Sequence, residues 1–193
     1  MKRPGVISRL IGEDGFTLLE LILVISILSV LSLLVFPRIS LFFKGERGNF
    51  IVLTSIISKT FDEAYLKGDI NYLVIHLAQP DHEMLDYGEN IFSRSNGISV
   101  VKMNEESAFV DSSHPLLGYH GFPGSFKIEE VLFRGNESVS RGSVLVPFYP
   151  SGISDNVILH ILANGTDRWS VKISRMQKEP SILPDYITFQ DEQ

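Results

Sequence analysis

The apolar residues of this chain are concentrated in one block near its beginning. From Phe16 to Phe36 the sequence holds a single charged side chain, Glu20. A helix over these residues would be about 32 Å long at about 1.5 Å per residue, and the hydrocarbon core of a bilayer is about 30 Å thick. The pattern therefore predicts one transmembrane helix at residues 16–36, preceded by a short polar segment at residues 1–15.

A second apolar pattern follows the block. Apolar residues recur at helical spacing on one face, interrupted only by Glu46, and they are Ile39, Phe43, Phe50, Leu53, Ile57, Phe61 and Ala64. This spacing is typical of an amphipathic helix with one buried face. We therefore expect the membrane helix to continue to about Leu66, where Gly68-Asp69 ends it, with a kink at Pro37.

Six short segments rich in β-branched and aromatic residues predict strands, because turn residues separate them. They are Ile70–Leu77, Ile98–Met103, Phe126–Phe133, Ser143–Tyr149, Val157–Leu162 and Arg168–Arg175. One long helix packed on antiparallel strands is an α+β fold. We expect a loop at Asn104–Ser125 and a loose acidic tail at residues 177–193, which leaves residues 37–176 as one globular domain.

Composition and charge narrow the function classes. The 193 residues include no cysteine, which excludes disulfides, a thiolate zinc site and a cysteine nucleophile. The net charge is −6, from 17 Lys and Arg against 23 Asp and Glu. Three residues of each sign lie before Phe36, so the part after Phe36 carries 14 Lys and Arg against 20 Asp and Glu. This acidic balance argues against nucleic-acid binding, which needs clustered basic residues.

The start of the apolar block forms a specific motif. Gly15-Phe16-Thr17-Leu18-Leu19-Glu20, followed by the apolar helix and Pro37, resembles the class III signal of type IV pilins and type II secretion pseudopilins. In that family a prepilin peptidase cuts after the glycine and methylates the new N-terminal phenylalanine. The resemblance therefore implies cleavage between Gly15 and Phe16, N-methylation of Phe16, removal of residues 1–15 as a leader, and a pilin-like fold.

Glu20 is the residue of the apolar block that needs an explanation. A charged acid inside a membrane helix costs about 2.5–3.5 kcal/mol on insertion scales. Cleavage would free an α-amine at Phe16, four residues earlier, and the amine of a neighbouring subunit could neutralise the acid in a packed helix array. We therefore expect Glu20 to act in filament assembly. The alternative is that Glu20 lies near enough to the membrane surface to reach water.

Ser26, Ser29 and Ser32 recur every third residue and lie on the face opposite Glu20. Small residues allow helices to approach closely in membranes. Each hydroxyl can equally bond back to its own helix. The sequence leaves both interpretations open.

The charges around the apolar block do not decide its orientation, because three basic residues lie close to it on each side. They are Lys2, Arg3 and Arg9 before it, and Arg38, Lys44 and Arg47 after it. The resemblance implies a leader in the cytoplasm, a single span in the inner membrane and a C-terminal domain in the periplasm.

Two local features are similar to the H-type minor pseudopilins: Glu63-Ala64 near the end of the long helix, and the turn Phe148-Tyr149-Pro150-Ser151-Gly152. This similarity implies a minor pseudopilin of a type II secretion system, whose periplasmic filament drives protein export. Its partners would be the prepilin peptidase, other pseudopilin or pilin subunits, and inner-membrane lipid. The alternatives are a minor type IV pilin of pilus assembly, twitching or DNA uptake, and a single-pass protein with an unrelated binding domain.

Other residue clusters give no sign of catalysis. Asp81-His82-Glu83, and the pair His114 and His120, lack the spacing of a zinc site. The glycines of residues 118–124 do not follow the dinucleotide pattern, and there is no Gly-x-Ser-x-Gly elbow. We therefore expect no enzyme activity, no cofactor and no metal site.

Overall fold

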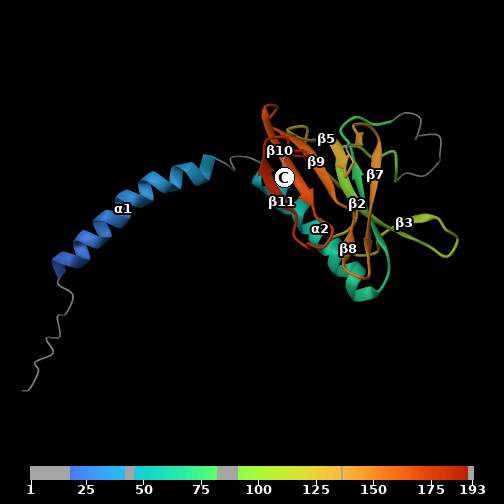
Figure 1. Ribbon diagram of the computed structural model, residues 1–193, viewed down its shortest axis with the longest axis horizontal. Coiled ribbons are helices and arrows are strands. Elements are labelled where there is room, and N and C mark those ends of the chain that lie inside the picture. The colour runs from blue at the N-terminus through green and yellow to red at the C-terminus, as the bar shows by residue number, and fades with distance from the viewer. Residues whose placement is uncertain (1–17, 42–45, 82–90, 136, 191–193) are drawn as a thin grey trace, which may run out of the picture. The chain divides into compact units, whose positions relative to one another are not determined.

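The computed structural model describes residues 18–41, 46–81, 91–135 and 137–190, with the backbone alone for residues 30–41. The chain divides into two compact units, Met1–Lys44 and Gly45–Gln193, the second of which we call the head. The first unit contains helix α1, Leu18–Leu41 (Figure 1). All described side chains of α1 are exposed, because nothing within this unit covers them.

The head begins with helix α2, Arg47–Lys67, which follows Glu46. Gly68 ends it in the left-handed conformation, with φ 73° and ψ 16°, and the Gly68 N–H donates to the Ala64 carbonyl at 3.0 Å. Glycine adopts this conformation without steric cost, which makes it the usual residue at this position. The predicted end of the helix is therefore confirmed, whereas continuity with α1 through residues 42–45 lies outside the described residues and stays a prediction.

The rest of the head forms two antiparallel sheets. The first sheet has the order β3-β2-β1-β7-β8, with β4 also paired to β2, and the second has the order β11-β10-β9-β5-β6. The strands are β1 Asn71–His76, β2 Gly97–Met103, β3 Phe109–Asp111, β4 His120–Gly121, β5 Phe126–Phe133, β6 Ser138–Val139, β7 Ser143–Tyr149, β8 Ile153–Ser154, β9 Val157–Ala163, β10 Asp167–Ile173 and β11 Ser181–Pro184.

One hydrophobic core joins α2 to both sheets. The buried face of α2 is made of Phe50, Leu53, Ile56, Ile57, Thr60, Glu63 and Ala64. The Phe50 ring packs edge-on against Phe126 of β5 and Trp169 of β10, with ring centroids 4.9 and 5.6 Å apart. The α+β class, with a long helix on antiparallel sheet, is confirmed (Figure 1).

All six predicted strands are present, and β5 and β7 have the predicted ends. The expectation of a plain loop at Asn104–Ser125 is wrong, because this stretch contains β3 and β4. It also buries Leu117 and Phe122 in the core. The apolar residues of the stretch are spaced too irregularly to predict this, and the edge of β2 provides the pairing.

The expectation of a loose tail is also wrong for residues 181–190. Strand β11 pairs with β10, from Trp169 opposite Pro184 to Lys172 opposite Ser181. The Ser170 hydroxyl then donates to the Asp185 carbonyl at 2.8 Å and accepts from the Ile187 N–H at 3.0 Å. The backbone of the tail therefore forms hydrogen bonds with β10, and the acidic composition of the tail does not prevent this pairing.

Candidate functional site: the N-terminal assembly segment and the groove along helix α2

The residues predicted for processing and assembly fall in or before α1. Gly15 and Phe16 lie outside the described residues, so cleavage and methylation there stay predictions. Glu20 lies in the first turn of α1. Pro37 lies within the same helix, near its end, and its predicted kink stays a prediction.

The surface of α1 is almost entirely apolar over its described side chains, which run from Leu18 to Ser29. Its exposed large apolar residues are Leu18, Leu19, Leu21, Ile22, Leu23, Val24, Ile25, Ile27 and Leu28. A helix that is apolar on all sides requires lipid or several neighbouring helices to cover it. Among the described residues, no helix has both the length and the hydropathy that a membrane crossing requires. The predicted span at residues 16–36 extends beyond those described side chains and stays a prediction.

The serines of α1 use their hydroxyls within the helix. Ser26 Oγ donates to the Ile22 carbonyl and Ser29 Oγ to the Ile25 carbonyl, each at 2.8 Å. This geometry is the back-bonding alternative left open by the sequence. The Ser32 side chain lies outside the described residues.

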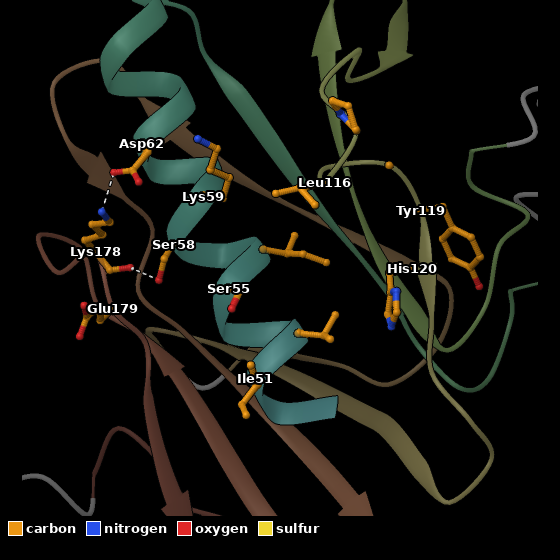
Figure 2. Close-up of a pocket in the computed structure, with 14 residues that line it drawn as sticks. Ile51, Ser55, Ser58, Lys59, Asp62, Leu116, Tyr119, His120, Lys178 and Glu179 are labelled. Carbon is orange, nitrogen blue, oxygen red and sulfur yellow. Dashed lines mark hydrogen bonds and ion pairs between the residues drawn. The ribbon is translucent and has the colours of Figure 1, made fainter. Parts of the chain in front are cut away.

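A groove of about 700 Å³ runs along the outer side of α2. Figure 2 shows α2 between two walls: Leu116, Tyr119 and His120 lie on one side, and Lys178 and Glu179 on the other. Two of its apolar side chains are more than half exposed, Ile51 at 53% and Leu116 at 67%. The groove therefore presents apolar surface to solvent next to the helix that anchors the core.

The charged wall of the groove is fixed to α2. Lys178 Nζ lies 2.8 Å from Asp62 Oδ1, and Ser58 Oγ donates to the Lys178 carbonyl at 3.3 Å (Figure 2). Lys178 and Asp62 thus neutralise each other within the chain, and apolar side chains such as Ile51 and Leu116 stay exposed in the groove. Sequence reasoning missed this surface, and the only available signal was the pair Leu116 and Tyr119 in an otherwise polar segment.

A buried histidine of the first sheet has the partners of a catalytic residue but not the access. His76 Nδ1 lies 2.8 Å from Ser143 Oγ, and its Nε2 lies 2.9 Å from Ser99 Oγ. Burial lowers the pKa of His76 to about 4, because the charged imidazolium would lose its hydration. His76 and Ser99 have no exposed surface, so substrate cannot reach them, and the three residues join β1, β2 and β7.

The histidines considered as metal ligands have other roles. His114 Nδ1 accepts from the Leu116 N–H at 3.2 Å, and the His120 ring packs against Phe122 with centroids 5.2 Å apart. Over the described residues, no group of three or more His, Asp and Glu side chains is placed to hold a metal. His82 and Glu83 lie outside that part of the chain.

The turn at Phe148–Gly152 has a geometric reason for its glycine. Gly152 has φ 76°, which disfavours any residue with a side chain, and a Cβ there would lie 3.5 Å from the Phe61 ring. Phe61 in turn packs edge-on against Phe148, with centroids 6.4 Å apart. The turn is thus fixed against α2.

Comparison with known protein families identifies the N-terminal segment. Residues 12–36 match the family described as the prokaryotic N-terminal methylation motif. This match confirms the prepilin-type N-terminal motif on which the resemblance to the type IV pilin-like superfamily rests.

Two solved structures of the minor pseudopilin EpsH, from the type 2 secretion system of Vibrio cholerae, are similar to this chain. One is 10% identical, with a TM-score of 0.42 over 70% of this chain and 95% of that chain. The other is 9% identical, with a TM-score of 0.46 over 70% of this chain and 91% of that chain. No curated protein sequence matches this chain.

Proposed function

We propose that this protein is a minor pseudopilin of a type II secretion system, a filament subunit rather than an enzyme. The observation that carries the proposal is the methylation motif at residues 12–36. This motif includes most of α1, whose described side chains are exposed and almost entirely apolar. Prepilin peptidase would cut after Gly15 and methylate Phe16. Residues 16–36 would hold the subunit in the inner membrane, with the head in the periplasm.

During assembly, neighbouring subunits would then replace the lipid around α1. Glu20 lies in the first turn of α1, four residues after Phe16. The methylated amine of Phe16 in a neighbouring subunit would pair with it. A charge pair between subunits would set the axial offset of one helix against the next.

The head supports secretion over DNA uptake as the role of the filament. The part of the chain after Phe36 has an acidic excess, 20 Asp and Glu against 14 Lys and Arg, which disfavours a nucleic-acid surface. The apolar groove along α2 supports contact with other protein subunits instead. A minor type IV pilin of twitching or piliation remains the second candidate, because the processing motif is common to both machines.

The proposal is tested by mass spectrometry of the protein from its native membrane. We expect 178 residues, the 193 of the chain less the 15 of the leader, beginning with methylated Phe16. Gly15→Leu should abolish cleavage, whereas the matched change Gly12→Leu within the leader should leave it intact. An uncut Met1 terminus in cells with active prepilin peptidase would contradict the proposal.

A gene deletion separates the two machines. Loss of exported proteins from the culture medium, with normal piliation, is the result expected for a pseudopilin. Loss of pili or twitching with normal export would assign the subunit to a type IV pilus.

A further inference from the structure

A small polar pocket lies where the two sheets meet, and it shares no residue with the groove along α2. It is lined by Phe133, Arg134, Ser154, Asp155, Asn156 and Arg175. Two hydrogen bonds hold its parts together: the Ser154 N–H donates to the Arg175 carbonyl at 2.9 Å, and the Arg175 N–H donates to Asn156 Oδ1 at 2.6 Å. The pocket thus joins β8 of the first sheet to the end of β10 in the second.

The pocket contains a buried donor without a partner. Ser154 is 1% exposed, yet its Oγ forms no hydrogen bond in the structure. About nine in ten buried polar groups in proteins are hydrogen-bonded, so an isolated hydroxyl needs an explanation. Because Asn156 Oδ1 accepts from the backbone, the amide nitrogen of Asn156 is a second donor beside the pocket.

The charges of the pocket favour a ligand with one negative charge. Arg134 and Arg175 are exposed, and across the described residues neither guanidinium forms an ion pair with an acid of this chain. Together with Asp155 they give the pocket a net charge of +1. A guanidinium binds the two oxygens of a carboxylate in a planar, bidentate geometry. A dianionic phosphate would leave the pocket with an excess negative charge.

We propose that this pocket is a carboxylate-binding site. Arg134 and Arg175 pair with the carboxylate oxygens, and the Ser154 hydroxyl donates to one of them. The carboxylate belongs either to a small free acid or to an acidic side chain of another protein, and both sources present the same group to the pocket.

The first test titrates the full-length protein in detergent with sodium acetate, at constant ionic strength maintained with chloride. Trp169 is the single tryptophan and lies in the head, so its fluorescence reports the melting temperature of the head. We expect a saturable rise in this temperature, and at least tenfold weaker apparent affinity in Arg134→Gln and Arg175→Gln. The matched control is Arg141→Gln, an exposed arginine outside the pocket. A response that does not saturate, or an equal loss in the control, would overturn the site.

The second test uses Ser154→Ala. Since the hydroxyl has no partner, its removal should not lower the melting temperature of the acetate-free protein, but it should weaken acetate binding severalfold. Acetate affinity equal to that of the parent would overturn the role of Ser154 and with it the proposed geometry.

The source of the carboxylate is identified with a photo-crosslinking residue at exposed Glu137, which lies across the β5–β6 hairpin from Phe133. A cross-link to another protein in native membranes that disappears in Arg175→Gln assigns the carboxylate to that protein. Saturable acetate binding without such a cross-link assigns the site to a free acid. Neither result depends on processing at Gly15, so the proposed function is tested separately.

Discussion

Helices α1 and α2 are of similar length, 24 and 21 residues, but they use their apolar residues in opposite ways. The described side chains of α1 are exposed on every side, whereas α2 buries one face against both sheets. The core of the head therefore stabilises α2, whereas the described side chains of the first unit form no core around α1. The difference separates a helix stabilised by tertiary packing from one whose proposed role is assembly.

The acids of the two helices differ in the same way. Glu63 of α2 is 4% exposed and pairs with Lys67 one turn later, and this contact lowers the pKa of Glu63. Glu20 of α1 lies in the first turn of its helix, four residues after Phe16. One helix neutralises its acid internally, and the other is proposed to do so through a second subunit.

The largest expected effect comes from Glu20→Ala. Insertion and cleavage should persist, because removing the charge removes a desolvation cost and leaves the Gly15–Phe16 bond unchanged. Incorporation into filaments should fall at least tenfold, measured as cross-linking to other pilin-type subunits in native membranes. Ser29→Ala is the control within α1. Parental levels of cross-linking in Glu20→Ala would show that the acid has no role in assembly.

Core truncations should affect α2 and not α1. Leu53→Ala or Ile57→Ala should lower the free energy of unfolding of the head by about 2–5 kcal/mol, because each side chain is fully buried. The measurement is denaturant unfolding of the full chain in detergent, followed by Trp169 fluorescence. The same truncation in α1, Leu23→Ala, should leave this transition unchanged. Equal losses in the two helices would contradict the division between them.

Acid should weaken the head through His76. Its folded pKa of about 4 lies below the ordinary value of 6.5, so the unfolded chain binds the proton more strongly and stability falls as pH drops below about 6.5. Between pH 6.5 and pH 5 the loss is about 1.6 kcal/mol, because the slope starts at about half of its full value of about 1.4 kcal/mol per pH unit at pH 6.5. The denaturation midpoint should shift accordingly in the parent and in His114→Gln, but less in His76→Gln. The helix content of α1 should not change, since residues 1–44 contain no histidine.

The smallest expected effects come from removing the same kind of side-chain hydrogen bond at a buried position and at an exposed one. Thr60 Oγ1 of α2 donates to the Ile56 carbonyl at 2.7 Å and is buried, whereas Ser29 Oγ makes the same bond on the exposed surface of α1. Thr60→Val should cost the head about 1 kcal/mol, and Ser29→Ala should change its stability by less than about 0.5 kcal/mol. Denaturant midpoints measure both. A loss of filament assembly in Ser29→Ala would instead show that the serine face packs against a neighbouring helix.

Local sequence chemistry predicted the central part of the fold. Asn164-Gly165 joins β9 to β10 in a tight turn, with φ 53° and 75°, and Asn-Gly is a favoured pair for such turns. The strand β11 has no comparable signal, because Ser181–Pro184 is short and lies among prolines and acids. It is a strand only because the edge of β10 supplies its hydrogen-bond partners.

The candidate sites divide in the same way. The position of Glu20 in a helix follows from a continuous motif, so the sequence was sufficient. The groove along α2 and the pocket at Ser154 combine segments far apart in the chain, including residues 51–62 with 178–179, and residues 133–134 with 175. Only the fold brings these segments together.

The position of β11 has a consequence for the timing of folding. In the described chain β11 pairs with β10 alone, and every strand of both sheets precedes it in sequence. If the chain is delivered from its N-terminal end, all other strand pairs can close while Ser181 is still in transit. During that interval the edge of β10 is open, and an extended peptide from a chaperone or a second nascent chain can occupy it.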